Sequence, residues 1–219
     1  MTAATMRSPS AISRLVCEEG AQQLRSRLLA EPPGLPLLPS RSDCDLNPHL
    51  QRRPPRELSP AAVLVTIVRR SDPTLLFTRR TPHLARHAGQ VSFPGGRLHE
   101  NDSSLVETAL RETHEETGID PALVSVAGFL DAYETGTGFA ILPVVGLLTE
   151  GFSLSANPHE VAEIFEVPLV FLMDAANCER HTAAWRGQTR AFHAFTYGKH
   201  YIWGATAGIL IDLRDKLCQ

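Results

Sequence analysis

The sequence predicts an α/β fold in which a mixed β-sheet lies between helices. Predicted strands outnumber predicted helices, and the main helix lies near the middle of the chain. A continuous apolar run of strand length, residues 61–68, begins the region that we expect to fold as one domain. Strands and helices in this order are typical of a sheet that is covered by helices.

Length and composition are those of an ordinary globular protein. The chain has 219 residues, of which 43% are hydrophobic and 21% are charged, and its net charge is −3. A chain of this length can bury a sizeable core within a single domain. The charge gives no sign of general nucleic-acid binding through a basic surface, although a local arginine cluster could still hold a substrate with several phosphates.

The sequence favours a cytoplasmic protein. No apolar run approaches the roughly 18 residues that span a membrane, and the start of the chain lacks the apolar core of a secretory signal. A mitochondrial-type leader is the alternative, because Arg7, Arg14 and several serines precede the first acid, Glu18. The scattered cysteines show no metal-ligand spacing and are expected to be free thiols in a reducing compartment. They are Cys17, Cys44, Cys178 and Cys218.

Residues 1–60 are expected to lie outside the main domain, which we place at residues 61–219. Residues 11–30 have apolar residues near helical spacing and are predicted to form an amphipathic helix. Its apolar side either packs on its own domain, which we favour, or forms the contact of a homodimer. Residues 32–60 are rich in proline and arginine, and proline at this density discourages helices and central strands. We expect a linker or an extended arm there.

The remaining elements follow from apolar patterns and turn signals. Strands are predicted at residues 61–68, 74–78, 91–93, 124–132, 139–148, 189–196 and 201–203. Pro143, inside the long apolar strand 139–148, favours an edge position or a bulge. Residues 160–165 are expected to open a loop and a short helix, with another short helix near residues 166–173. Residues 205–217 are predicted to end the chain as a helix.

Residues 104–118 give the clearest helix signal. Ser104 followed by Glu107 fits a capping box, and Gly118 stands where a C-terminal glycine cap belongs. An apolar stripe along one side predicts a face that is buried in a core. The stripe consists of Leu105, Val106, Ala109, Leu110 and Thr113.

The same helix carries three glutamates, Glu112, Glu115 and Glu116, whose spacing places them on one side. At about 100° per residue they lie roughly a quarter-turn from the apolar stripe. Neighbouring carboxylates repel each other, and a divalent cation that prefers oxygen ligands, such as Mg²⁺ or Mn²⁺, removes that repulsion. A solvated acidic face is the alternative. The preceding Pro94–Gly96 favours the metal site, because glycine lets the backbone approach a ligand closely, although a plain turn is the other interpretation.

This region resembles the Nudix box, G-x5-E-x7-R-E-U-x-E-E-x-G-U, in which U is an aliphatic residue. Residues 96–119 match that pattern with three departures. Asp102 occupies the first acidic position, eight residues instead of seven separate it from Arg111, and Thr113 stands where an aliphatic residue is usual.

The preceding segment, residues 75–96, is similar to the signature of one Nudix branch, the coenzyme A pyrophosphatases. That branch also tends to carry the aspartate and the extra residue, so these departures favour the branch. Ala85 differs from the arginine that is frequent there, and Arg86 is the neighbouring substitute. Together the two motifs cover roughly 45 of the 219 residues.

The family resemblance implies an α/β/α sandwich and a metal-dependent pyrophosphohydrolase. One of the helix glutamates, or a carboxylate from another loop, would act as the general base. Arg111 is expected to orient a glutamate through a charge-assisted contact, and Asp102 either caps the helix or holds Arg111. The implied ligands of Mg²⁺ or Mn²⁺ are Glu112, Glu115, Glu116 and the carbonyl of Gly96.

The branch resemblance implies that coenzyme A or an acyl-CoA is cleaved to 3′,5′-ADP and (acyl-)4′-phosphopantetheine. The residues expected to bind the phosphates are Arg80, Arg86, His87 and Gln90, with arginine suited to phosphate by its planar fork of donors. Phe195, Tyr201 and Trp203 are candidates for stacking on adenine, although aromatic residues in strand-like segments more often belong to the core.

Two alternatives remain at this point. A Nudix enzyme could act on another nucleoside diphosphate derivative, such as ADP-ribose, NADH or a nucleotide sugar; residues 75–90 argue against it. A ligand-binding protein with this fold and no catalysis is the second. The intact glutamates argue against that alternative, because a retired site need not keep three carboxylates that repel one another.

Overall fold

The computed structural model describes residues 14, 20–83, 87–185 and 187–218. Among them, the main sheet contains β1 (Arg41–Ser42), β2 (Ser59–Val68), β3 (Thr74–Arg80), β4 (Val91–Ser92), β5 (Gly95–Arg97), β6 (Val124–Phe129), β7 (Tyr133–Glu134), β8 (Phe139–Leu148) and β9 (Val161–Pro168). A second sheet contains β10 (Cys178–Trp185), β11 (Gln188–Tyr197) and β12 (His200–Trp203). The named α-helices are α2 (Ala21–Arg25), α3 (Leu105–Thr117), α4 (Leu169–Met173) and α5 (Ala205–Leu217). Four 3₁₀ helices are η1 (Asp43–Leu46), η2 (Pro55–Glu57), η3 (Pro121–Leu123) and η4 (Ala175–Asn177).

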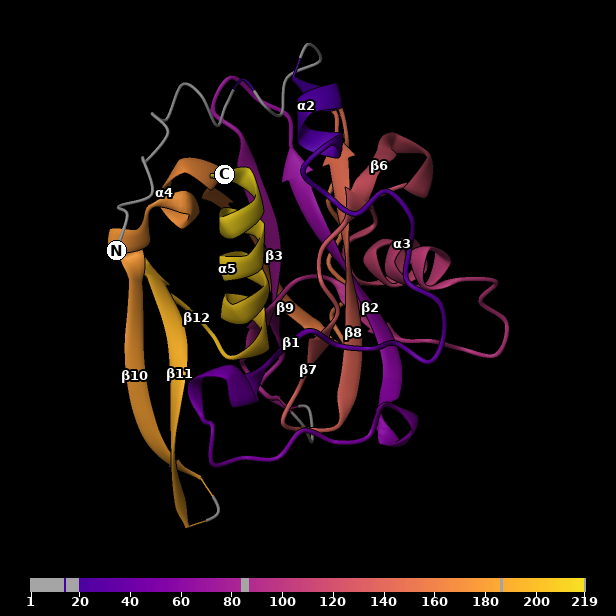
Figure 1. The fold of residues 1–219 in the computed structure, drawn as a ribbon. Helices are drawn as coiled ribbons and strands as arrows, with labels where there is room; N and C mark the ends of the chain where they lie inside the picture. The colour runs from indigo at the N-terminus through magenta and orange to yellow at the C-terminus, as the bar shows by residue number, and fades with distance from the viewer. Residues whose placement is uncertain (1–13, 15–19, 84–86, 186, 219) are drawn as a thin grey trace.

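The main sheet is mixed and lies between helices, as predicted (Figure 1). Its strands follow the order β1-β7-β8-β2-β3-β4, while β5, β6 and β9 pair with β2, β8 and β3. Successive side chains of a strand point to opposite faces. Accordingly, Ala62 and Leu64 of β2 pack in the cluster that contains residues of α3. Val65 and Ile67 pack in the cluster that contains residues of α5.

Both long helices form where the sequence predicts them. The Ser104 hydroxyl accepts a hydrogen bond from Glu107 N (3.2 Å), which caps the start of α3, and Gly118 (φ 76°) caps its end. The reciprocal bond of a capping box is displaced by one residue, because the Glu107 carboxylate accepts from Ser103 N instead of Ser104 N. Helix α5 has the predicted bounds, and its leucines Leu210, Leu213 and Leu217 are fully buried.

The edge position predicted for residues 139–148 is wrong, because β8 is a central strand. It pairs with β2 on one side and with β6 and β7 on the other. The other expectation was a bulge, and the ladder with β6 does shift register, between Val126 and Gly128 and not at Pro143. Pro143 is tolerated in β8 because its backbone lies opposite the residues that connect β6 to β7. In that connection, Leu130 N donates a hydrogen bond to the Pro143 carbonyl (3.1 Å). The missing N–H of the proline therefore removes no bond of either ladder.

The helix predicted to begin at residues 160–165 is also wrong. Residues 161–168 form β9, which pairs antiparallel with β3 from Thr74 opposite Pro168 to Arg80 opposite Val161. Branched and aromatic side chains such as Ile164 and Phe165 suit a pleated surface, and pairing with β3 decides the conformation. The following residues do form a short helix, α4, near the predicted position.

The helix predicted at residues 11–30 ends earlier than expected. Helix α2 ends at Arg25, and Leu29 forms an antiparallel bridge with Phe129 of β6. Prolines at 32 and 33 follow closely and prevent helical continuation. Residues 11–13 and 15–19 of the prediction lie outside the described residues. The following arm contacts the domain, because Leu24 and Leu37 are buried and β1 pairs with β7.

The second sheet contains one strand that the sequence analysis did not predict. Strand β10 pairs antiparallel with β11, which also pairs with β12, in the order β10-β11-β12. Phe195 and Ile202 of this sheet are fully buried in the cluster that includes the leucines of α5. The sheet therefore packs on the outer side of α5 (Figure 1).

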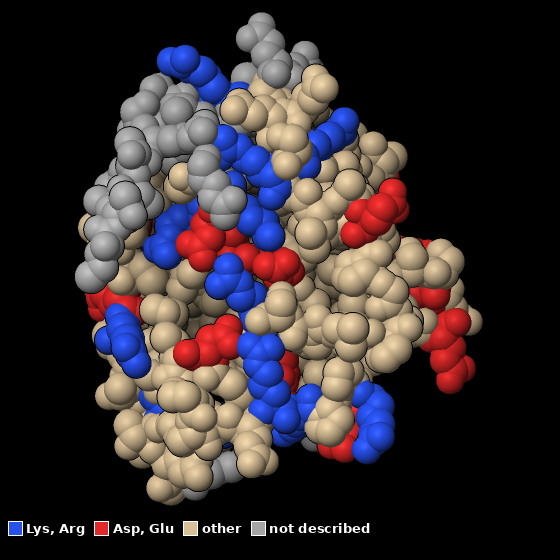
Figure 2. Space-filling model, viewed as in Figure 1, with Lys and Arg blue, Asp and Glu red and all other residues tan. Residues whose placement is uncertain are grey.

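Three features bear on the composition-based expectations. Among the described residues, Cys44, Cys178 and Cys218 lie outside any disulfide, as predicted, and Cys17 is not described. Among the described helices, none has the length and apolar character of a membrane span. On the face drawn in Figure 2, positive and negative side chains are interspersed, so the described residues form no broad basic patch there.

We predict that Gly208→Ala destabilises the protein. A Cβ at Gly208 of α5 would lie 2.5 Å from Cε2 and 2.7 Å from the hydroxyl oxygen of Tyr133. That ring has little room to move, because it is 6% exposed and its hydroxyl donates to Asp43 (2.8 Å). Overpacking of this kind lowers the free energy of unfolding by about 1–3 kcal/mol, which exceeds the gain in helix propensity.

Thermal unfolding followed by circular dichroism measures this effect. Gly34→Ala is the matched control, because a Cβ at Gly34 would meet no atom within 4 Å. An unfolding midpoint for Gly208→Ala at or above that of the unmodified protein would contradict the packing described here.

Candidate active site

Helix α3 places its three glutamates beside the buried stripe at different depths. Glu116 is 3% exposed, whereas the side chain of Glu112 is 14% exposed and that of Glu115 is 54% exposed. The sequence spacing predicted that the three glutamates share one side of the helix. Their side chains become more exposed with increasing distance from the core. Two of the carboxylates are therefore removed from water, and the third lies at the rim.

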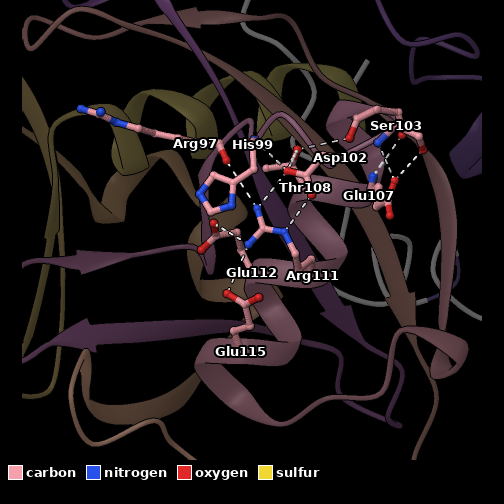
Figure 3. A network of polar contacts seen from close by, with 10 residues as sticks. Arg97, His99, Asp102, Ser103, Glu107, Thr108, Arg111, Glu112 and Glu115 are labelled. Atoms are coloured by element: carbon pink, nitrogen blue, oxygen red, sulfur yellow. Dashed lines mark hydrogen bonds and ion pairs between the residues drawn. The ribbon is translucent and has the colours of Figure 1, made fainter.

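Arg111 is held by Asp102 in a two-bond contact (Figure 3). Arg111 Nε donates to Oδ1 (2.8 Å) and Nη2 donates to Oδ2 (2.9 Å) of Asp102. The same carboxylate accepts from His99 N and from the Thr108 hydroxyl, each at 2.9 Å. These donors, Arg111 first, hold the pKa of Asp102 well below its usual range. Of the two expectations for Asp102, the structure shows that it holds Arg111.

Arg111 extends this contact to the glutamates. Its Nη1 donates to Glu112 Oε1 (2.9 Å) and to Glu115 Oε2 (3.2 Å), as Figure 3 shows. The Arg111 guanidinium thus orients the carboxylates of Glu112 and Glu115, and the Asp102 carboxylate in turn holds the guanidinium. Burial still raises the pKa of Glu112, although Arg111 opposes that shift. Arg111 therefore makes the charge-assisted contact to a glutamate that the sequence predicted.

Gly96 lies directly against Glu112. Strand β5 pairs with β2, with Gly96 opposite Ala62, so its backbone is fixed by the centre of the sheet. A Cβ at Gly96 would lie 2.4 Å from Glu112 Cδ and 2.5 and 2.6 Å from its carboxylate oxygens. Only glycine leaves room for the carboxylate in this position. The close approach of this glycine to a bound metal ion, which the sequence analysis expected, stays a prediction; in the structure the Glu112 carboxylate lies beside the Gly96 backbone.

Glu116 lies in an environment that disfavours its charge. Burial raises the pKa of Glu116 to about 8, and the charges of Glu112 and Glu160 contribute in the same direction. Arg80, with Nη1 3.8 Å from Glu116 Oε1, and the Thr78 hydroxyl, which donates to Oε2 (3.4 Å), oppose the shift only in part. A buried carboxylate with so little compensation is suited to bind a cation.

Arg80 connects Glu116 to the predicted substrate residues. Its Nε is buried and makes no hydrogen bond among the described residues, which is uncommon for a buried donor. The Arg80 N–H donates to the carbonyl of Gln90 (3.0 Å). His87 Nδ1 donates to Gln90 Oε1 (2.7 Å), which joins these two predicted residues. Arg86, the fourth, lies outside the described residues.

The sequence analysis did not identify Glu160, which lies near Glu116 although it is distant in the chain. The loop that carries it is tied to the end of α3, because Asn157 N donates to the Glu116 carbonyl (3.1 Å). It is tied to the end of β3 by Thr81 N, which donates to the Glu160 carbonyl (2.9 Å). The sequence analysis left open a carboxylate from another loop, and no local motif marks this one. Thr78 lies within the segment 75–96, but the sequence analysis gave it no role, because only the folded chain shows that its hydroxyl reaches Glu116.

The arrangement fits a divalent cation only in part as it stands. Among the described residues, no three His, Cys, Asp or Glu side chains are close enough together to hold a metal ion. Glu112 and Glu115 are instead occupied by Arg111. Nevertheless, the buried and poorly compensated Glu116 and the close approach of Gly96 to Glu112 are what a hard cation with oxygen ligands requires. Glu116 and Glu112 therefore have the chemistry that such an ion requires, although the full ligand set is not assembled among the described residues.

We predict that Gly96→Ala abolishes hydrolytic activity without unfolding the protein. The added methyl group would overlap the end of the Glu112 side chain, which can rotate away at small cost in stability but then leaves its position beside the backbone. Turnover and the melting temperature should be measured together. Loss of both in parallel, or full activity, would contradict this explanation.

We predict that Glu116 makes the metal-free protein less stable as the pH rises. Because its pKa is raised from 4.5 to about 8 in the folded protein, the folded state binds a proton that the unfolded state has lost. The free energy of unfolding therefore falls between about pH 4.5 and 8, by up to about 1.4 kcal/mol for each unit of pKa difference. Glu116→Gln lacks this penalty and should gain stability over the unmodified protein across that window.

Urea unfolding at pH 5 and pH 8.5, with a chelator present, measures the difference. Glu115→Gln is the control, because that carboxylate is 54% exposed. If Glu116→Gln and the unmodified protein had parallel pH profiles, the burial of a charged Glu116 would not have the effect described.

Both solved structures and related sequences are similar to this chain. Two solved structures similar to this one are a MutT/nudix family protein from Enterococcus faecalis and a Caenorhabditis elegans Ap4A hydrolase. The first has a TM-score of 0.47 and 19% identity and covers 75% of this chain and 62% of its own. The second has a TM-score of 0.44 and 17% identity and covers 50% and 80%. Neither likeness is close enough to bear on activity.

The sequence matches are much closer. The NUDIX domain model matches residues 58–189, which include α3 and β5. The uncharacterized Nudix hydrolase NudL of Photorhabdus laumondii is 43% identical over 168 residues, covering 75% of this chain and 90% of that protein. NudL of Escherichia coli O7:K1 is 40% identical over 153 residues, covering 70% and 80%. The chain therefore belongs to the Nudix hydrolase family, and the cluster around Glu112 and Glu116 is its candidate active site.

Proposed function

We propose that this Nudix hydrolase cleaves the diphosphate of coenzyme A or an acyl-CoA to 3′,5′-ADP and (acyl-)4′-phosphopantetheine. The observation that carries the proposal is the position of Arg80. Its guanidinium lies beside Glu116 with a buried, unpartnered Nε among the described residues, and its backbone is bonded to Gln90. The segment that resembles the coenzyme A branch is thereby adjacent to the carboxylates of α3.

Hydrolysis adds water across one P–O bond of the diphosphate. The water oxygen bonds to phosphorus, the bridging oxygen leaves with the other phosphate, and a carboxylate accepts the proton of the water. The proton acceptor is a glutamate of α3 or Glu160, which lies on another loop near Glu116. Arg80 would donate to a phosphate oxygen, and a planar guanidinium suits that contact.

Glu112, Glu115, Glu116 and the Gly96 carbonyl would hold Mg²⁺ or Mn²⁺. The ion supplies neutralisation of phosphate charge and a lower pKa of bound water. Arg111 has a positioning role. Asp102 holds its guanidinium, which fixes the side chain of Glu112, one of the proposed ligands of the ion. His87, Gln90 and Arg86 complete the proposed phosphate contacts. The cytoplasmic location remains a prediction, and a homodimer contact through residues 11–30 remains the less favoured alternative to packing on the same domain.

A product assay tests the substrate. We expect purified protein with Mg²⁺ or Mn²⁺ to convert coenzyme A to 3′,5′-ADP, identified by mass, faster than it cleaves ADP-ribose or NADH. Chelator should abolish turnover, and Glu116→Gln should lose it by orders of magnitude. Preferred cleavage of ADP-ribose or NADH would replace the coenzyme A assignment, and unchanged metal-dependent turnover in Glu116→Gln would remove Glu116 from catalysis.

Two neighbouring arginines provide a matched test of the phosphate contact. Arg80→Lys keeps the charge but loses the planar fork, so its KM for coenzyme A should rise. Arg79→Lys is the control, because Arg79 pairs with Glu163 (3.1 Å) instead of the candidate site. Equal effects of the two substitutions would show that Arg80 has no special contact with substrate.

A further inference from the structure

The second sheet carries aromatic side chains on the face that does not pack on α5. Cross-strand partners in an antiparallel sheet share a face, and Trp203 is opposite Ala194 while Tyr201 is opposite Thr196. Phe192, two residues before Ala194, shares that face. Of the three rings considered for stacking on adenine, Phe195 is fully buried and belongs to the core. Tyr201 and Trp203 are 40% and 37% exposed.

The ring of Trp203 is held in place although it is partly exposed. It contacts Phe192, with ring centroids 5.5 Å apart and the planes tilted by 60°. Such tilted contacts are favoured between aromatic rings and restrict the indole to one arrangement. A ring that packs on one side and is open on the other can stack on a flat ligand with little loss of side-chain conformational entropy.

Trp203 also lies at the end of β12 that is followed by a turn beside Gln90. The next residue is Gly204, where a Cβ would lie 3.9 Å from Gln90 Nε2. Two residues further on, the Thr206 hydroxyl donates to the Val91 carbonyl (3.2 Å), so this end of β12 is fixed against β4. Tyr201 lies about 7 Å further along the strand, toward His200, which contacts Glu163 (3.2 Å).

These contacts form a continuous path from the carboxylates to Gly204, the residue that follows Trp203. Glu116 lies beside Arg80, Arg80 is bonded to Gln90, and Gln90 adjoins Gly204. A diphosphate bound at Arg80 would carry its nucleoside on one side and its other substituent on the opposite side. A nucleobase has a π-face and gains from stacking on an aromatic side chain whatever its hydrogen-bonding pattern.

We propose that Trp203 is a specificity-determining residue that stacks on the nucleobase of the substrate. The inference rests on the proposed function for the identity of the diphosphate, and it assigns the nucleoside end of that substrate to the β12 side of the site. The occupant is the substrate's own base, because Trp203 is exposed and the residue that follows it, Gly204, adjoins Gln90, one of the proposed phosphate-binding residues.

Steady-state kinetics with coenzyme A test the stacking. We expect Trp203→Ala to raise KM by about tenfold, the scale of a lost base–aromatic stack, with kcat changed little. Trp203→Phe should restore most of the affinity. Tyr201→Ala is the matched control, from the same strand and face with similar exposure, and should leave KM unchanged. Equal KM values for Trp203→Ala and the unmodified protein would overturn the proposal.

Fluorescence provides a readout that does not depend on turnover. The chain has two tryptophans, so Trp185→Phe leaves Trp203 as the only emitter. We expect 3′,5′-ADP to quench that emission in Trp185→Phe but to have no such effect in Trp203→Phe. Quenching by 4′-phosphopantetheine and not by 3′,5′-ADP would overturn the proposal.

Further outcomes separate the proposal from its rivals. If ADP-ribose were the substrate and its KM rose in Trp203→Ala, the coenzyme A assignment would fail and the stacking role would stand. If Trp203→Ala changed the molar mass in light scattering and left ligand affinity intact, the indole would belong to a contact between two copies of the chain, and the stacking role would be overturned.

Discussion

The contact between Arg111 and Asp102 is the interaction on which the rest of the candidate site depends. One guanidinium makes two bonds to a shielded aspartate and still reaches Glu112 and Glu115. Without it, acidic side chains on adjacent turns of α3 would repel one another, and their directions would be set by solvent. The contact does not reach Glu116. Among the described residues, Glu116 is compensated by Arg80 and Thr78, and burial still raises the pKa of Glu116 to about 8.

The arm before β2 has a structural part in this arrangement. Arg41 Nη2 contacts Asp212 of α5 (3.0 Å), whose other oxygen accepts from Asp131 N (2.9 Å). Asn47 bonds to both backbone groups of Ala191 in β11, with distances of 2.9 and 2.7 Å. The arm therefore joins the main sheet, α5 and the second sheet. These polar contacts explain why a segment rich in proline and arginine follows the surface of the domain.

The sequence predicted the parts of the fold that local patterns determine. Helix α3 with its Ser104 and Gly118 caps, helix α5 and strand β2 each carry periodicity and end signals within their own residues. The errors concern pairing between distant segments. The conformation of residues 161–165 is decided by β3, and the tolerance of Pro143 depends on where β6 ends and β7 begins. Neither fact is present in the local sequence.

The same distinction applies to the candidate site. Glu112, Glu116, Gly96 and Arg111 were predicted because one motif contains them, and the structure brings them together. Glu160 and Thr78 come from other elements, and only the folded chain shows that they adjoin Glu116. Glu115 is exposed and held by Arg111, so its part as a ligand is a prediction that the geometry leaves untested.

The loop that carries Glu160 is attached mainly through the backbone. Asn157 N and Ser155 N donate to the carbonyls of Glu116 and Thr117, and the Glu160 carbonyl accepts from Thr81 N. Main-chain bonds of this kind do not depend on which side chains the loop presents. Substitutions in the loop can therefore alter the charge that adjoins Glu116 without detaching the loop from α3. In this chain, the helix supplies the glutamates of the candidate site, while the loop supplies a neighbouring charge that a substitution can change without moving the helix.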